Sequence, residues 1–361
     1  MMGFSRPFFL LAVCSGLAGA TDLCGMLYMP TTLSKDRSPY RIIGDIYVPP
    51  ASRLTIEAGV EIVVAAKDSC EQDLKQLDWS DSQYVSIKVD GAFFVKGTPE
   101  SPVIIRPEHP QQGKVLWDGL RVHKQDPGAA QIQCLHISGA NHALQAERTS
   151  FPVENCIFEG NNTGIFLGEK ANLQITNNLF VHNTSAGVFL QFAAPDMIAN
   201  IFYENPNYGV WADSRKGVKV ENNLFWKNGE ANCWHCPATM GKRKGTDAQS
   251  DSIDAAGNLY ADPVFMGTQA EAEYKRKDKF EPTPAADVVD STLATRHHKA
   301  DSLGKAGLAP RPVFIPSGAG KWRLSQYSPA LDAAPDKKAF LDANGTRGDI
   351  GPWGATAKYS K

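Results

Sequence analysis

Four consecutive segments of the chain repeat one pattern of apolar and polar positions. They read VENCIFEGNNTGIFLGE, ITNNLFVHNTSAGVFLQ, MIANIFYENPNYGVWAD and VENNLFWKNGEANCWHC, and a weaker earlier copy reads CLHISGANHALQAE. One aromatic column recurs every 22 or 23 residues, at Phe158, Phe180, Phe202 and Phe225. Short β-rich runs at this period, separated by Asn, Gly and Ser, predict the coils of a parallel β-solenoid. Helical repeats are longer and need apolar residues at i, i+3 and i+4, which these segments lack.

The alternation of side chains along a strand assigns these columns to faces. In NNLFVHN, Asn178 and Phe180 share one side of the strand, and Leu179 lies on the other. We place Asn and Phe inside because these positions keep their chemistry from copy to copy, and stacked amides can hydrogen-bond between coils. Four apolar residues then face outward, and we expect a loop to cover part of that sheet: Ile157, Leu179, Ile201 and Leu224.

The second strand of each copy carries an outward aromatic column. Its inner positions are Ile165, Val188, Val210 and Cys233, followed two residues later by Leu167, Leu190, Ala212 and His235. The residues between them point outward: Phe166, Phe189, Trp211 and Trp234. Rings in register would offer flat apolar faces to pyranose sugars, with Asp213 beside them for hydroxyl groups. The alternative is that residues 267–320 or the closing segment cover these rings.

The pattern resembles the right-handed parallel β-helix (pectin-lyase-like) superfamily, especially secreted bacterial members of uncertain activity. Residues 44–64 (GDIYVPPASRLTIEAGVEIVV) and 85–107 (VSIKVDGAFFVKGTPESPVIIRP) resemble the first coils of such proteins. GNLYADPVF at 257–265 resembles the end of their regular helix, and YSPALDAAPDKKAFLDANGTRGDIGPWG at 327–354 resembles their closing segment. We therefore expect an all-β, right-handed parallel β-helix of seven or eight coils of about 22 residues, with an N-terminal cap and a C-terminal extension. This fold hosts lyases, hydrolases, epimerases, adhesins and binding proteins, so the resemblance leaves function open.

The chain divides into four parts by composition. Residues 1–20 have one Arg, a short apolar run and a small-residue end, which predicts a signal peptide cleaved before Thr21. The β-helix with its cap occupies 21–266, a polar insertion that packs back or is partly disordered occupies 267–320, and the closing segment occupies 321–361. We expect a secreted or cell-surface protein; a lipoprotein attached at Cys14 is disfavoured by the bulky Val13. Asn161, Asn183 and Asn344 begin Asn-x-Ser/Thr triplets, which matter only in a host that glycosylates.

Charge and hydropathy argue against nucleic acid binding and against a membrane-spanning segment. With 37 basic and 39 acidic residues, the chain gives no electrostatic reason to expect nucleic acid. No run after the signal peptide approaches the roughly 20 apolar residues of a membrane span. We expect a monomer with no transmembrane segment.

Six cysteines remain after the signal peptide, and they allow 15 full pairings. Cys233 and Cys236 form a C-x-x-C. On a continuous strand their Cα atoms would be about 10 Å apart, beyond the roughly 7 Å that a disulfide spans. We therefore expect no bridge between them unless the strand ends in a turn, which Asn232 in place of Gly and the following Pro237 would favour. A redox role is disfavoured, and so is a zinc site, because no second ligand pair is visible.

Candidates for acid–base chemistry lie beside the aromatic column and in one turn column. They are Arg215 and Lys216, which follow Asp213, and His182 and Lys227, which share a turn position with Glu204. The resemblance implies that lyases of the superfamily use a Lys or Arg base with calcium or cations that neutralise a uronate, whereas its hydrolases use clustered Asp. Asn-Thr-Asp, Asp-Asp and Gly-His-Gly are missing from the coils. A Lys, Arg or His base near a cation would suit proton abstraction next to a carboxylate, and solvated turn charges are the alternative.

Together these features predict a protein that binds an extracellular or cell-wall polysaccharide along its outward aromatic face. Whether it also cleaves that polymer, most plausibly as a lyase, stays open. The alternative is a non-catalytic surface, structural or adhesin-like solenoid. We expect no metal and no cofactor.

Overall fold

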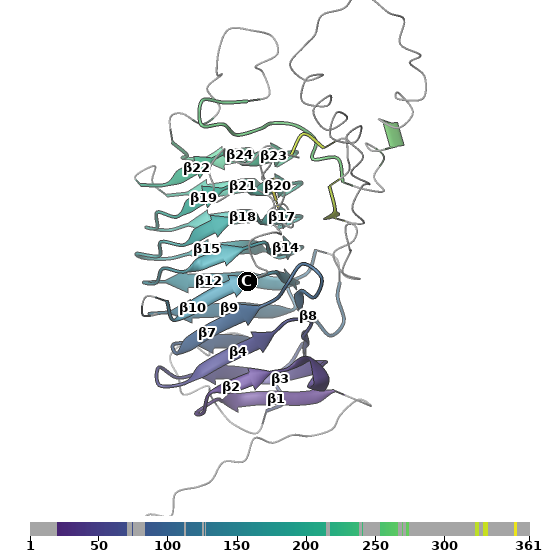
Figure 1. Cartoon of the computed structure of the whole chain (residues 1–361), viewed down its shortest axis with the longest axis vertical. Helices are drawn as coiled ribbons and strands as arrows, with labels where there is room; N and C mark the ends of the chain where they lie inside the picture. Colours follow the sequence, from purple (N-terminus) through teal and green to yellow (C-terminus); the bar gives the residue numbers. More distant parts are fainter. Residues whose placement is uncertain are drawn as a thin grey trace, which may run out of the picture.

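The described part of the chain is a parallel β-solenoid (Figure 1). The computed structural model describes residues 20–70, 74, 84–111, 113–124, 126, 128–213, 217–237, 240, 253–265, 269, 272–273, 322–324, 328–330 and 350–351. The predicted signal peptide and nearly all of 267–320 therefore lie outside the described residues. Within the described part, no helix is long and apolar enough to cross a membrane.

Each coil contributes one strand to each of three faces. Face 1 is an eight-stranded sheet of β2 (Thr31–Leu33), β4 (Arg53–Glu57), β7 (Ala92–Lys96), β10 (Ala130–Gln133), β13 (Pro152–Glu154), β16 (Gln174–Thr176), β19 (Asp196–Ile198) and β22 (Lys219–Glu221). Faces 2 and 3 meet in the long strand β3 (Tyr40–Val48), whose two halves start two series of strands.

Face 2 continues from β3 through β5 (Glu61–Val64), β8 (Val103–Pro107), β11 (Leu135–Ser138), β14 (Ile157–Glu159), β17 (Leu179–Val181), β20 (Ile201–Tyr203) and β23 (Leu224–Trp226). Face 3 continues through β6 (Ser86–Val89), β9 (Trp117–His123), β12 (Ala140–Glu147), β15 (Thr163–Leu167), β18 (Ala186–Leu190), β21 (Tyr208–Ala212) and β24 (Ala231–Trp234). At the N-terminal end β1 (Thr21–Met26) pairs with β3, and the 3-10 turn η1 spans Lys35–Arg37. The predicted β-helix and its coil length are confirmed, and the solenoid has about nine turns of about 23 residues where seven or eight were predicted.

Two asparagine ladders and one phenylalanine stack fill the interior of the upper coils, β13 to β24. In the first ladder each amide nitrogen donates to the amide oxygen of the next coil at 3.0–3.2 Å, through Asn178, Asn200, Asn223 and Asn258. The second ladder repeats this bond through Asn161, Asn183, Asn205 and Asn228. Between the ladders the rings of the Phe158 column stack at 4.8–5.0 Å. The predicted inward direction of Asn and Phe is confirmed. Asn161 and Asn183 are also 1% and 0% exposed, so the folded chain does not present these two triplets for glycosylation.

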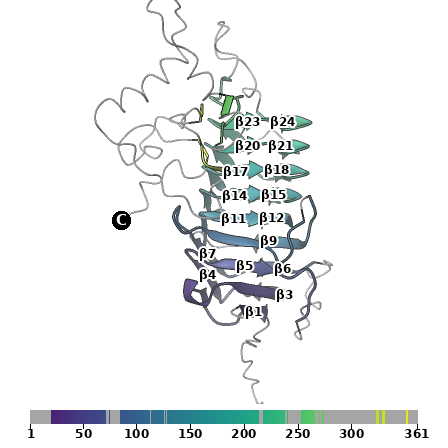
Figure 2. The same ribbon diagram turned by 90° about the vertical axis from the view of Figure 1, so that its right-hand side faces the viewer.

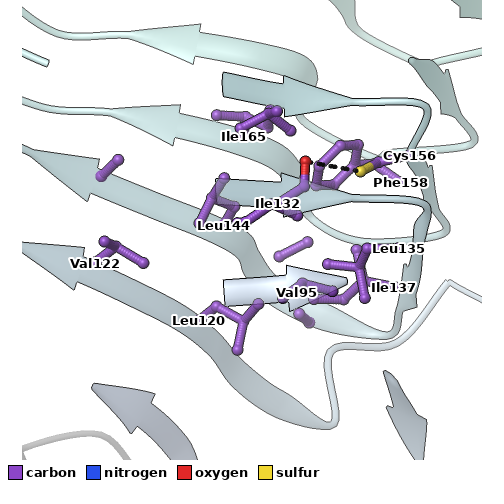
Figure 3. Close-up of a cluster of buried hydrophobic side chains, with 14 of the residues drawn as sticks. Val95, Leu120, Val122, Ile132, Leu135, Ile137, Leu144, Cys156, Phe158 and Ile165 are labelled. Atoms are coloured by element: carbon purple, nitrogen blue, oxygen red, sulfur yellow. Dashed lines mark hydrogen bonds between the residues drawn. The ribbon is translucent and has the colours of Figure 1, made fainter. Parts of the chain in front are cut away.

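The interior of the lower coils is mainly aliphatic, with Phe93 and Trp117 as buried aromatic exceptions. Figure 3 shows Val95, Leu120, Ile132 and Leu144 packed below Phe158. Cys156 marks the boundary, because its backbone N–H donates to Asn178 Oδ1 as a ladder residue does, while its thiol lies 4.0 Å from the Ile132 carbonyl. Cys156 therefore begins the first ladder.

The outward apolar column on face 2 is covered, as predicted. Ile157, Leu179, Ile201 and Leu224 are all 0% exposed. Their cover comes from separate later pieces of the chain, which we call the strap: Leu259, Phe265, Trp322, Ala330 and Ile350. The described strap segments lie beside β17 and β20 in both views (Figures 1 and 2). The end of the regular helix and the closing segment therefore cover face 2 together in the described residues.

The prediction that Cys233 and Cys236 do not bridge held only for a continuous strand, and the exception stated with it applies because the strand ends in a turn. They form a disulfide with Cα atoms 5.7 Å apart. β24 ends at Trp234 and His235 takes the left-handed conformation (φ 56°), so the chain turns back before Cys236. His235 is exposed rather than inward, and Cys236 is buried in its place. A second disulfide joins Cys24 to Cys70, and Cys134 and Cys156 are buried free thiols.

Candidate functional site

One outward column runs along face 3 from the first coil to the last. Each member is paired in register with the next: Tyr47, Lys88, Arg121, Gln145, Phe166, Phe189, Trp211 and Trp234. Its first four members are polar or charged apart from the Tyr47 ring, and its last four are aromatic. The change from one chemistry to the other falls between β12 and β15.

The aromatic half of the column is a stack of rings. Phe166 lies 5.4 Å from Phe189, and Phe189 lies 4.2 Å from Trp211, with interplanar angles of 12° and 14°. The expectation that every ring offers its flat face outward is therefore corrected, because these faces contact each other and the edges point outward. Trp234 is 46% exposed at the upper end and lies 6.3 Å from the Tyr208 ring, so it presents the open aromatic surface of this half.

His142 lies at the lower end of the stack, with its ring tilted by 40° to that of Phe166. Its ring centroid lies 4.9 Å from that of Phe166. The strand register shifts beside it, between His142 and Leu144, where β12 pairs with β9. Gly119 makes this bulge possible: its φ is 131°, and a Cβ there would lie 1.7 Å from the His142 carbonyl oxygen. Bulges re-aim side chains and are common beside active sites.

Two buried carboxylates lie in the charged half near this bulge. Asp118 accepts a 2.6 Å bond from Arg121 Nε, with side-chain exposures of 4% and 27%. Asp45 Oδ1 accepts bonds from the backbone N–H and the hydroxyl of Ser86, at 2.8 and 3.1 Å. Each carboxylate is thus held by donors from its own or a neighbouring strand. We call Asp118, Arg121 and His142 the junction cluster.

Asp90, directly after β6, contacts three titratable side chains of face 3. Its carboxylate accepts the Tyr47 hydroxyl at 2.9 Å and lies 3.7 Å from both Lys88 Nζ and His123 Nδ1. Lys88 Nζ also lies 5.6 Å from the centre of the Tyr47 ring. These contacts fix the lower end of the outward column.

Burial shifts the pKa values of titratable side chains in the charged half of face 3. It raises the pKa of Asp45, partly opposed by the bonds from Ser86, and raises the pKa of Tyr47 to about 12. Burial also lowers the pKa of His142, an effect that the nearby Asp118 carboxylate opposes and Arg121 reinforces. His142 therefore stays a neutral imidazole at neutral pH.

The predicted turn column forms, but at the corner with face 2. His182 Nε2 lies 3.2 Å from Glu204 Oε2, and Lys227 Nζ lies 3.4 Å from Glu204 Oε1. Burial tends to raise the pKa of Glu204, yet bonds from His182, Tyr203 and Lys227 outweigh it and lower the pKa. The His182 ring lies 5.6 Å from Trp322 of the strap. These contacts tie His182 and Lys227 to the strap side of the solenoid rather than to the aromatic stack.

The remaining predicted site residues lie at the end of β21. Asp213 Oδ2 accepts a 2.8 Å bond from the backbone N–H of Phe192, whose side chain is 72% exposed. Arg215 and Lys216 lie outside the described residues. Among the described residues, no three His, Cys, Asp or Glu side chains are arranged to hold a metal ion.

Sequence reasoning missed the junction cluster. The run WDGLRVH at 117–123 predicts only the start of a coil. A lone Gly within a strand pattern signals a bulge, so Gly119 was the available clue. It could not have shown that Asp118 and His142, 24 residues apart in the chain, meet there.

Family models cover most of the solenoid. Residues 25–141 match a model described as pectate-lyase like beta helix domain, and residues 126–237 match one described as right handed beta helix region. Neither the curated proteins nor the solved structures gave a match. The two matched ranges overlap at 126–141 and together span 25–237. The chain therefore belongs to the right-handed parallel β-helix superfamily.

Proposed function

We propose that this chain is an exported protein that binds an extended polysaccharide along face 3. The observation that carries the proposal is the outward column, in which polar side chains give way to aromatic ones on a single face. A match to a pectate-lyase-like domain supports a carbohydrate-related function. The predicted signal peptide supports an encounter outside the cell.

The column offers two kinds of contact to a sugar chain. The open surface of Trp234 suits the apolar face of a pyranose ring. Gln145, Arg121 and Lys88 offer donors for hydroxyl or carboxylate groups. Six strand steps separate Lys88 from Trp234, a span of about 29 Å, so the site fits an oligomer rather than one sugar.

The other two faces fit this role less well. The strap buries the outward column of face 2. The most exposed residues of face 1 are charges and amides, such as Arg53, Glu57, Gln174 and Lys219, and Lys219 is paired with Asp196 at 2.9 Å. Face 3 combines half-buried charges with a stacked column of outward aromatic rings, and no described strap residue covers it.

A binding measurement with a matched control tests the proposal. The mature protein is passed over pectate, alginate, xylan and peptidoglycan, and retention is compared with that of Trp234→Ala. We expect retention on at least one glycan and a roughly tenfold weaker affinity for the variant, since one stacked aromatic contributes on the order of 1 kcal/mol. Tyr28→Ala is the control, because Tyr28 is a 63% exposed aromatic at the opposite end of the solenoid.

Two results would reject the proposal. One is the absence of retention on all four glycans. The other is an equal loss of affinity in the Trp234→Ala and Tyr28→Ala variants, which would show general adhesion of exposed rings rather than a site on face 3.

A further inference from the structure

The Cys233–Cys236 disulfide closes a short loop at the upper end of face 3. The loop reads CWHC, and its two middle residues, Trp234 and His235, are both exposed. Cys233 is partly exposed, whereas Cys236 is 8% exposed. β24 is the last strand of its sheet among the described residues, so no described strand lies above the loop. A reagent in solution can therefore reach the bridge from the Cys233 side.

The two disulfides of the chain constrain it to different extents. Cys24 and Cys70 are separated by 46 residues in the sequence, and Cys233 and Cys236 by 3. In the chain-entropy account, a cross-link stabilises the fold more when the loop that it closes is longer. The bridge at the N-terminal end therefore suits a structural role. The short bridge acts mainly on the conformation of the two residues that it encloses.

The stack of outward rings stops one coil before the end of face 3. Trp211 is paired in strand register with Phe189 below it and with Trp234 above it. The lower pair stacks at 4.2 Å with an interplanar angle of 14°. Trp234 instead contacts the rings of Tyr208 and His235, at 6.3 and 5.2 Å and with tilts of 56° and 32°. The backbone register thus permits one more stacked pair than the described rings make.

The disulfide explains this break in the stack, because Trp234 lies inside the loop that it closes. In the three coils below, the strand runs one residue past the outward ring, to Leu167, Leu190 and Ala212. β24 ends at Trp234 itself, and His235 turns the chain back with its Nδ1 3.2 Å from the Ala212 carbonyl oxygen.

The bridged turn and a regular last coil exclude each other. On an extended path the Cα atoms of Cys233 and Cys236 would lie about 10 Å apart, whereas in the bridge they are 5.7 Å apart. Only the reduced chain can therefore continue the strand as the coils below do. On that path the Trp234 ring lies over Trp211, and both ring stacking and the burial of an exposed ring favour this arrangement.

We propose that Cys233–Cys236 is a reversible redox site that sets the position of Trp234, with a dithiol as its reductant. One thiolate of the dithiol attacks the Cys233 sulfur, and Cys236 leaves as a thiolate that takes up a proton. The second thiol of the reductant then attacks the mixed disulfide. Cys233 is released as a thiol, and the reductant leaves as its own disulfide, so two electrons and two protons pass to the protein.

The two states differ in the aromatic surface that face 3 presents. The oxidised protein exposes the Trp234 ring, and the reduced protein stacks it on Trp211. Control of glycan binding by this change rests on the proposed function, in which Trp234 contacts the sugar. The movement of the ring does not depend on that function and is tested separately.

Circular dichroism of the indoles tests the movement directly, because two stacked indoles give an exciton signal that separated indoles lack. The mature protein is equilibrated with mixtures of reduced and oxidised dithiothreitol. Alkylation and mass spectrometry then give the fraction of Cys233 and Cys236 that is reduced. We expect the exciton signal to grow with this fraction, and to be absent from Trp234→Phe at every ratio. A Cys233→Ser/Cys236→Ser variant should show the signal without reductant.

The serine variant is also the control for the other cysteines. Dithiothreitol opens the Cys24–Cys70 bridge as well, but in this variant its addition should leave the indole signal unchanged. Cys134 and Cys156 are both 0% exposed free thiols, so they add no reducible bridge. Melting temperatures show whether the variants fold.

Three results would overturn the redox site. The bridge stays closed in the folded protein at ratios that open Cys24–Cys70, the indole signal stays constant while Cys233 becomes reduced, or the serine variant gives the signal of the oxidised protein. Retention on the glycans separates this proposal from the binding site. Retention roughly tenfold weaker after reduction supports both, since one aromatic contact is lost. An indole signal that grows with no retention in either state supports the redox site and rejects the polysaccharide site.

Discussion

The lower and upper coils of this solenoid fill their interiors and cover their faces with different kinds of side chain. Below β13 the interior is mainly aliphatic and face 3 carries charged pairs around a bulge. Above it, amides and phenylalanine rings stack inside, rings stack outside, and a strap covers face 2. The upper half repeats one coil closely, whereas the lower half departs from the repeat where titratable groups gather. The regular half holds the stacked amides and rings, and the irregular half holds the bulge and its titratable groups.

The amide ladders show why the upper interior must stay uniform. Asn200 Oδ1 accepts from Asn178, while Asn200 Nδ2 donates to the next amide and to the Ile175 carbonyl. A buried polar network is stabilising only while every member is satisfied. The upper end of this ladder is closed by Asp254, whose carboxylate accepts from Asn258.

The largest effect is expected from an apolar residue placed inside the ladder. Leu135 occupies the same column in the lower half. His136 pairs with Ile157, so the residue before each of them, Leu135 and Cys156, lies in the ladder column. Asn200→Leu should nevertheless cost about 4 kcal/mol, because it leaves several buried backbone and amide groups unpaired at roughly 1–3 kcal/mol each. Chemical denaturation measures this cost.

A matched change in the aliphatic half sharpens the contrast. Ile132→Val, which removes one methyl group without breaking a hydrogen bond, should cost about 1 kcal/mol. A similar cost for the two variants would contradict the idea that the halves are stabilised differently.

The next largest effect is expected at the bulge. Gly119→Ala adds a Cβ against the His142 carbonyl oxygen at a φ of 131°, and should cost about 2–3 kcal/mol through backbone strain. Gly128→Ala is the control: its φ is also positive, at 78°, but no atom lies near the added Cβ. An equal loss in both variants would assign the effect to φ alone and not to the bulge.

The repeat explains what the sequence could predict. Like residues lie above like residues in stacked coils, so a column visible in four segments fixes both its direction and its neighbours. The inward Asn and Phe columns and the need for a cover over Leu179 followed from this rule and are confirmed.

Features that break the repeat could not be predicted in the same way. The Cys233–Cys236 bridge depends on where β24 ends, and the left-handed turn at His235 is a single-residue event. The register shift that joins Asp118 to His142 depends on contacts between β9 and β12, and one chain segment alone does not reveal it. Rings in register also stack face to face, so alternation predicted the direction of Phe189 but not which surface of the ring meets solvent.

The smallest effect is expected at the boundary between the halves, where Cys156 begins the first ladder. Burial raises the pKa of its thiol to about 12, opposed by backbone bonds including one with Leu135, so the sulfur is a neutral thiol in the place of an amide oxygen. Cys156→Asn would offer a stronger acceptor there and a donor to Asn178, extending the ladder by one coil. We expect a gain of about 0.5–1 kcal/mol in the free energy of unfolding, the net value of one hydrogen bond, whereas Cys156→Val should lose a similar amount. Thermal and chemical denaturation of the two variants decide the point. If valine proves the better residue, the aliphatic interior extends to this coil and the ladder begins only at Asn178.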